Sequence, residues 1–287
     1  MFLKDKAVLV SLSISQWTAR KYDKKVTQQV SESYGVGLGS DVGRYNKKLL
    51  PIDTYLKDVH RKSSTVRNKF YDNTLSWIVD GTQMLPNKNY MEFMADFRRE
   101  KAEWQYLVDS FLDEYPRMKL EAQRLLPNGL YCEDDYPSVD DLRQKFKMDM
   151  FVAPLPDTEN FFTTLIDSEV DKIRQDVTKR VTETQSAAMK EVWQRLYKRV
   201  QHMVEKLDDP SAIFRDSMVE NAKETCALLT RLNFIDDPNL EAMRQEVEQK
   251  LANQNPDALR LDPVFRATKA DEAKAIMSKM DAFMGGL

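Results

Sequence analysis

Basic and aromatic residues gather near the start of the sequence, where they could hold an anionic chain. Trp17 is followed closely by four cations, and three more cations follow the glycine-rich stretch GVGLGSDVG at 35–43. Cations neutralise phosphates and aromatic rings stack on bases, so this combination could contact a nucleic acid. The candidate contact residues are Trp17, Arg20, Lys21, Lys24, Lys25, Arg44, Lys47 and Lys48.

The same segment has a plainer interpretation as the solvated side of an amphipathic helix. Ala19, Tyr22, Val26 and Val30 recur at spacings of three and four, which puts them on one stripe of a helix with the cations opposite. The stretch 35–43 lacks the spacing of known phosphate-binding loops, so it predicts a flexible loop. Both interpretations of the cations stay open.

A second basic patch lies on a long helical segment further along the chain. Its cations alternate with Trp193 and Tyr197, which would supply stacking rings unless they belong to the core. The patch consists of Lys190, Arg195, Lys198 and Arg199.

Combinations typical of catalysis are missing from the sequence. There is no nucleophile elbow, Walker loop, zinc-protease helix or calcium loop, and the chain has only two cysteines and two histidines. Neither pair has the spacing of metal ligands. Acidic pairs such as Asp140-Asp141 accompany helix starts, where carboxylates are stabilised. The sequence therefore predicts a non-enzymatic protein without cofactor or metal, and a metal-dependent hydrolase stays as a third hypothesis.

Charge is distributed unevenly along the chain. Residues 1–70 hold 14 Lys and Arg against 6 Asp and Glu, although the whole chain has a net charge of −3. A basic segment on an acidic chain can bind an anionic partner or acidic residues of its own chain. No apolar run approaches the length of a membrane span, the N-terminal apolar run lacks a signal-peptide cleavage site, and the cysteines are few. These features predict a soluble cytoplasmic protein without a membrane partner.

Hydrophobic periodicity predicts a mainly α protein with a small β element. Alternation at 8–14 and again at 148–152 indicates two strands that could pair. Helical spacing indicates helices at 52–70 and 90–115, an ordered connector at 72–90, and a helix beginning at Ser138. A shift in composition near 157 divides the chain into a basic α+β region, 1–156, and a helical region, 157–287.

The longest helical pattern covers 165–207 and would run about 60 Å. A second helix at 211–232 follows after a short connection, which predicts an antiparallel helical hairpin in an elongated protein; shorter helices follow at 239–252 and 269–284. The apolar stripe of the long helix must be covered, so the sequence predicts self-association through Val177, Val181, Ala188, Val192 and Leu196.

Several phrases of the sequence are similar to an uncharacterised family of bacteriophage and mobile-element proteins. They are SLSISQWTARKYDKKV, DVGRYNKKLL, LPNKNY, NGLYCEDDYPS and DDPSAIFRDSMVENAKETCALLTRLN, spread over residues 5 to about 255. Genes of that family often lie near a MoxR-type AAA ATPase and a von Willebrand A protein, or near recombination genes. The resemblance implies an accessory of a remodelling or DNA-processing system and carries no catalytic residues.

Two functional hypotheses follow. The first is a non-enzymatic binding or assembly protein of a phage or mobile element that acts through helical surfaces. It would form a homo-oligomer and could bind a AAA ATPase or a host protein. The alternative is a single-stranded nucleic-acid-binding protein that uses the basic N-terminal helix.

Overall fold

A computed structural model describes residues 3–35, 43–126, 129–156, 167–209 and 211–285. The chain forms two compact units, each assembled from segments that are distant in sequence. Unit 1 comprises 1–11, 69–95 and 151–287, and unit 2 comprises 12–68 and 96–150. This division differs from the predicted boundary at 156/157, because long helices and strands of the N-terminal half contribute residues to both units.

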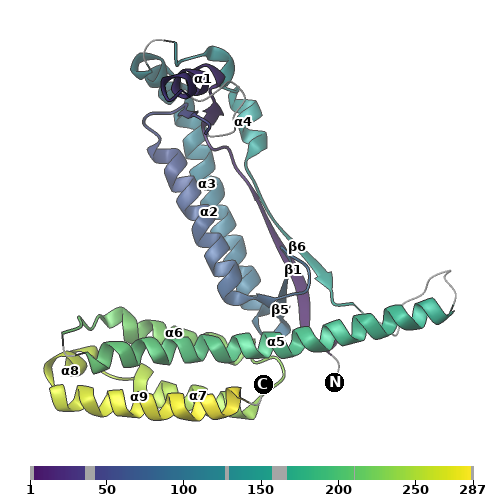
Figure 1. Cartoon of the computed structure of the whole chain (residues 1–287), viewed down its shortest axis with the longest axis vertical. Helices are drawn as coiled ribbons and strands as arrows, with labels where there is room; N and C mark the ends of the chain where they lie inside the picture. Colours follow the sequence, from purple (N-terminus) through teal and green to yellow (C-terminus); the bar gives the residue numbers. More distant parts are fainter. Residues whose placement is uncertain (1–2, 36–42, 127–128, 157–166, 210, 286–287) are drawn as a thin grey trace. The chain divides into compact units, whose positions relative to one another are not determined.

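The described chain is mainly helical with a small sheet, as predicted (Figure 1). The strands are β1 (Ala7–Ser15), β2 (Arg20–Tyr22), β3 (Asn46–Lys48), β4 (Leu75–Ser76), β5 (Gln83–Pro86) and β6 (Lys147–Pro154). The helices are α1 (Lys24–Ser33), α2 (Thr54–Asn73), α3 (Asn87–Leu125), α4 (Val139–Lys145), α5 (Asp167–Asp208), α6 (Asp216–Leu232), α7 (Pro238–Val247), α8 (Pro256–Leu261) and α9 (Pro263–Met284). Among the described helices, none combines the length and the apolar character that crossing a membrane requires.

The strands form a four-stranded sheet and a separate two-stranded ribbon. In the sheet the order is β4-β5-β1-β6, so the predicted neighbours β1 and β6 do lie side by side. Strand β5 comes from the predicted connector and pairs antiparallel with β1, with Ala7 opposite Pro86. The ribbon pairs β2 with β3 and belongs to unit 2.

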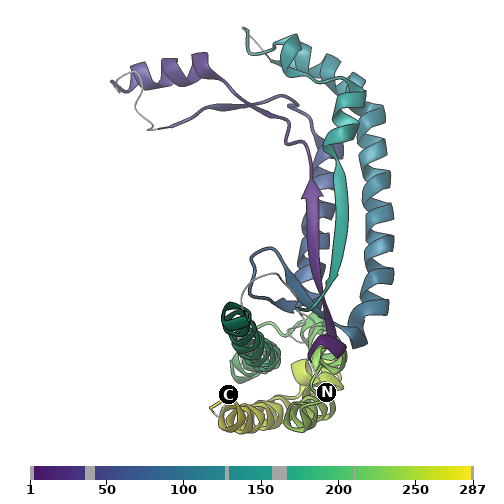
Figure 2. The ribbon, with the colours of Figure 1, turned by 90° about the vertical axis from the view of Figure 1, so that its right-hand side faces the viewer.

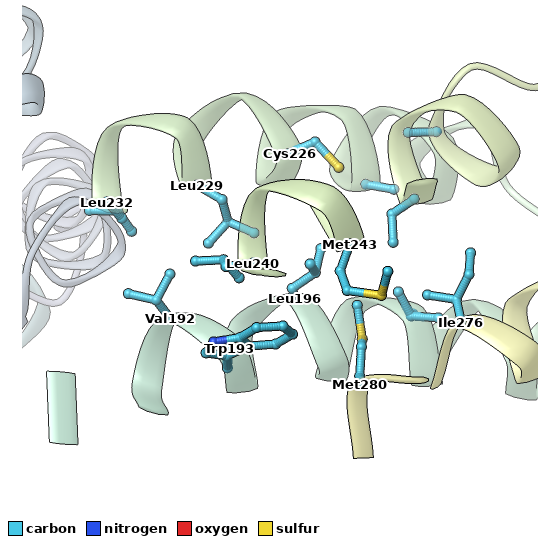
Figure 3. Close-up of a cluster of buried hydrophobic side chains, with 14 of the residues drawn as sticks. Val192, Trp193, Leu196, Cys226, Leu229, Leu232, Leu240, Met243, Ile276 and Met280 are labelled. Carbon is cyan, nitrogen blue, oxygen red and sulfur yellow. The ribbon is translucent and has the colours of Figure 1, made fainter. Parts of the chain in front are cut away.

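The core of unit 1 is a layer of apolar side chains between α5, α6, α7 and α9. Figure 3 shows Val192 and Leu196 of α5 facing Leu229 of α6 and Leu240 of α7. Cys226 lies in the same layer, where burial raises the pKa of its thiol to about 12 and keeps it neutral. Helices α5 and α6, which were predicted to form a hairpin, are part of a small bundle with α7 and α9 (Figure 1); Figure 2 views this bundle along its helices.

Helix α5 has 42 residues, which at 1.5 Å per residue is about 63 Å. Its C-terminal half is covered by α6, α7 and α9, whereas its N-terminal half extends beyond these helices (Figure 1). Ala188, Val192 and Leu196 are buried within this covered half. The prediction that these three residues form a self-association surface is therefore wrong, because helices of the same chain already cover them.

Val177 and Val181, the other two predicted self-association residues, lie on the N-terminal half of α5. Both are half-buried, and no described residue between 171 and 187 is fully buried. The apolar stripe predicted from the sequence is thus continuous, but its two halves have different environments. One half is core and the other remains partly open.

Unit 2 is organised by a buried polar contact between α2 and α3. The indole nitrogen of Trp104 donates to Ser63 Oγ at 2.8 Å, and Ser63 Oγ donates to the side chain of Gln16 at 2.7 Å. Phe111, Tyr115 and Phe146 pack around the same helices. Helix α3 continues past Pro116 to Leu125, so that proline does not end it.

The N-terminal basic segment folds differently from the predicted helix. Residues 20–22 form strand β2, and α1 begins only at Lys24 because Asp23 caps it by accepting the backbone N–H of Val26 at 3.0 Å. Ala19 has a φ of 52°, which turns the chain before the strand. Arg20 and Lys21 therefore lie on a strand, and the predicted helical stripe through Ala19 and Tyr22 does not form.

Leu196→Ala tests whether the covered half of α5 is core. Leu196 is fully buried, so the truncation should lower the free energy of unfolding by about 2–5 kcal/mol in urea denaturation. Val264→Ala is the matched control, since Val264 on α9 is 77% exposed and should change the value by about 0.5 kcal/mol or less. Equal effects of the two variants would contradict this assignment.

Candidate nucleic-acid interface

The β2–β3 ribbon brings two of the predicted basic segments together. Antiparallel pairing places Arg20 opposite Lys48, Lys21 opposite Lys47 and Tyr22 opposite Asn46. The backbone N–H of Leu49 donates to Ala19 O at 2.8 Å, and that of Asp23 donates to Tyr45 O at 2.9 Å. Segments separated by more than twenty residues in sequence thus share one surface.

The hydrogen-bond pattern determines which side chains share a face. Because the bonded pairs alternate with non-bonded pairs, Arg20 and Lys48 form a non-hydrogen-bonded pair, in which side chains lie closest. Tyr22 and Asn46 extend the same face, since residues two apart in a strand point the same way. All four side chains are exposed. We call these four residues the basic ribbon face.

The opposite face of the ribbon carries the buried Lys47 and the exposed Lys21, and both lie near carboxylates. Lys47 is only 6% exposed; its Nζ lies 2.8 Å from Asp135 Oδ2 and 3.5 Å from Asp23 Oδ2, and it donates to Leu130 O at 2.8 Å. Lys21 Nζ lies 3.7 Å from Asp135 Oδ1. Lys47 therefore has a structural role, and because it is buried it cannot contact a ligand.

The pKa shifts of this cluster follow from the same contacts. Burial would lower the pKa of Lys47, but the hydrogen bond and charge of Asp135 outweigh it and raise the pKa above 10.5. The Val26 N–H lowers the pKa of Asp23 below 3.8, against desolvation and with help from Lys47. The stabilisation from the Asp23 carboxylate is fully present at pH values above its ordinary pKa of 3.8 and is lost as the pH falls through its folded-state pKa. The stabilisation from the Lys47 ammonium group is fully present at pH values below its ordinary pKa of 10.5 and is lost as the pH rises through its folded-state pKa.

Two arrangements on the exposed side are electrostatically unfavourable in the isolated chain. Like charges directly opposite each other destabilise a strand pair, as Arg20 and Lys48 do. Lys24 and Lys25 occupy the first turn of α1, where the helix dipole disfavours cations. In the described part of the chain, none of these four cations forms an ion pair. An anion bound here would relieve both repulsions.

The aromatic residue of this surface is not the predicted one. Trp17 is half-buried, with its ring 6.2 Å from that of Phe111 and 5.8 Å from that of Tyr115, so it packs against α3. Tyr22 is 47% exposed on the basic ribbon face, and Tyr45, just before β3, is 41% exposed. Helical periodicity does not reveal Tyr22 as a contact residue, because it places this residue on the apolar stripe of a helix. The cap residue Asp23 was the signal for a later helix start.

Arg44, the remaining predicted contact, is exposed beside Tyr45. It also lines a small pocket of about 340 Å³ with residues of α1, including Val30 and Tyr34. Most of the predicted loop at 35–43 lies outside the described residues.

The second predicted patch, on α5, does not act as one surface. The Arg195 guanidinium donates to the carbonyls of Tyr71, Asp72 and Thr74 and pairs with Glu191, so it caps the end of α2. Trp193 is 1% exposed and donates to Asp237. Lys190 and Lys198 are exposed and Arg199 is half-buried. Only Lys198 and Arg199 keep charged groups available along one groove.

No group of three or more His, Cys, Asp or Glu side chains in the described ranges is placed to hold a metal ion. Comparison of the chain with protein-family models, with curated proteins and with solved structures finds no match.

Lys47→Met tests the inward side of the ribbon. The substitution keeps most of the unbranched side chain but leaves Asp135 and Asp23 without their cation, so we expect a loss of about 3–5 kcal/mol in the free energy of unfolding at neutral pH. Lys48→Met is the matched control on the exposed face and should change that value by about 0.5 kcal/mol or less. If both variants were equally stable, Lys47 would not have the structural role described here.

Proposed function

We propose that this protein is a non-enzymatic nucleic-acid-binding protein that holds a single strand on the basic ribbon face. The observation that carries the proposal is the exposed pair Arg20 and Lys48, which repel each other across the ribbon. Like the exposed Lys24 and Lys25 that follow in α1, they form no ion pair in the described chain. Departures from local electrostatic rules are expected at functional sites, where a ligand compensates them.

Tyr22 favours a single strand over a duplex. An exposed ring between cations can stack on an unpaired base while the cations follow the backbone phosphates. In a duplex the bases are stacked on each other and give such a ring no free face. The resemblance of the sequence to phage and mobile-element proteins is compatible with this proposal, since it implies an accessory of a remodelling or DNA-processing system.

The test is a mobility shift with a fluorescent single-stranded oligonucleotide across a salt series. The double variant Arg20→Glu, Lys48→Glu should weaken binding about tenfold or more at low salt. Because each phosphate contact contributes about 0.7 to the salt slope of a single strand, losing two should reduce the slope by about 1.4.

Two controls make the result specific. Arg98→Glu with Arg99→Glu changes the charge equally on exposed α3 residues of the same unit and should leave most of the affinity. Tyr22→Ala should weaken binding while leaving the salt slope unchanged, and Tyr22→Phe should restore it. Absence of binding at low salt, or equal losses in the two charge-reversal variants, would refute the proposal.

A second candidate function is self-association through the open half of α5. The N-terminal part of α5 extends beyond α6, α7 and α9 (Figure 1), and its Ile173 and Val177 are half-buried, whereas the half-buried Val181 packs against the core of unit 1. Apolar stripes at helical spacing are commonly covered by another helix. Such a surface would suit a second copy of the chain as its occupant, in line with the assembly role predicted from the long helix.

Sedimentation velocity at micromolar concentration tests this second function. The wild type should sediment as an oligomer, and Val177→Lys should shift it to a monomer without lowering its helix content. Glu183→Lys is the control, because it adds positive charge to an exposed position of the same helix. A wild type that is monomeric throughout the concentration range would remove this candidate.

A further inference from the structure

Unit 1 contains a groove of about 690 Å³ between α5 and α6 that no function above uses. Helix α5 contributes Glu191, Arg195, Lys198 and Arg199, and helix α6 contributes Asn221, Glu224, Thr225 and Leu228. We call it the α5–α6 groove. The opposite sides of the same helices form the core in Figure 3, where Leu196 and Cys226 point inward. The groove is therefore built on two well-packed helices.

Residues at the end of α2 and in the sheet border this groove. Tyr71, Asp72, Ser76 and Gln83 contribute to its lining. The Arg195–Glu191 pair joins these residues to α5, since Arg195 donates to carbonyls at the end of α2 and Glu191 accepts the backbone N–H of Ser76 at 3.1 Å. Arg195 and Glu191 therefore have their partners within the protein and shape the groove without offering free charge to a ligand.

Two cations of the groove keep donors available. Arg199 donates through Nε to Thr225 Oγ1 at 3.2 Å, which orients the guanidinium and leaves its terminal nitrogens for a ligand. Lys198 is its exposed neighbour. Neither cation pairs with a carboxylate of the described chain. Adjacent Arg and Lys donors with a polar neighbour such as Asn221 suit the oxygens of a phosphate group.

The rest of the lining argues against a long polyanion as the ligand. Asp72, Glu191 and Glu224 balance the charges of Arg195, Lys198 and Arg199, so the lining is neutral overall. A neutral site gives no long-range attraction to a nucleic-acid chain, whereas it can bind one phosphate at its cations. Glu224 lies on the other wall and is an acceptor for hydroxyl groups.

We propose that the α5–α6 groove binds a small phosphate ester that carries hydroxyl groups. Lys198 and Arg199 hold the phosphate, and Glu224 accepts hydrogen bonds from the hydroxyls. The volume falls within the range of about 300–1,000 Å³ that is usual for small-molecule sites. This ligand differs from the single strand proposed for the basic ribbon face, which belongs to unit 2.

Isothermal titration with ribose 5-phosphate, inorganic phosphate and ribose tests this proposal on the full chain. Ribose 5-phosphate should bind more tightly than inorganic phosphate, and ribose should not bind measurably. Lys198→Gln and Arg199→Gln should each weaken the phosphate ester about 10–100-fold, the effect of losing a hydrogen bond to a charged group. Glu224→Ala should weaken ribose 5-phosphate but not inorganic phosphate.

Lys190→Gln is the matched control, because Lys190 is exposed on the same helix and does not line the groove. Arg199→Lys keeps the charge, and Lys198→Gln alters an exposed side chain, so two informative variants remain if Arg199→Gln fails to fold. The proposal is overturned if no ester binds saturably or if Lys190→Gln is as harmful as Lys198→Gln. It is also overturned if the groove variants weaken oligonucleotide binding and leave ester binding unchanged, which would identify the terminal phosphate of a strand as the ligand.

Discussion

The buried cation Lys47 fixes the surface on which the proposed function depends. Its Nζ lies between Asp135 and Asp23 and donates to the carbonyl of Leu130, so the Lys47 side chain points inward from the β2–β3 ribbon. Because side chains alternate along a strand, Lys48 and its partner Arg20 must then point outward. The inward charge is neutralised by carboxylates and the outward charges are left to the solvent.

Asp23 connects this ion-pair cluster to the neighbouring helix. The same carboxylate caps α1 through Val26 and approaches Lys47, so the helix start and the ribbon are held by one group. The cap also explains why Lys24 and Lys25 can occupy the unfavourable first turn of α1, since a carboxylate at the N-terminus compensates part of the dipole. The ion pair of Lys47 thereby stabilises a ribbon whose exposed face carries Arg20 and Lys48, and the exposed Lys24 and Lys25 of α1 follow in sequence.

Helix α5 shows how a single uniform element can have two environments. Its apolar stripe has the same spacing throughout, yet Val192 and Leu196 are core while Val177 is only half-buried. The cations on another side of the same helix also differ in their surroundings. Arg195 is committed to the end of α2, and Lys198 and Arg199, one turn further along, keep donors for a ligand. The partner elements, and not the helix itself, make this difference.

The sequence by itself determined much of the local structure of this protein. Periodicity predicted the helical content, the long α5, its return through α6 and the strands β1 and β6, because the spacing of apolar residues depends only on each segment. Ser138 predicted the start of α4, where its side chain accepts the N–H of Asp141. The asymmetry of charge likewise predicted that the cations of the first 70 residues bind an anionic partner or acidic residues of their own chain.

Tertiary structure decided which of these residues are available. Pairing of β2 with β3 depends on a long-range contact that no local pattern encodes, so the sequence placed Arg20 and Tyr22 on a helix. Burial of Lys47, Trp17 and Trp193 depends on Asp135, Phe111 and Asp237, which are far from them in sequence. A cation or an aromatic ring looks the same in a sequence whether it contacts a ligand or its own chain, because only its neighbours in space make the difference.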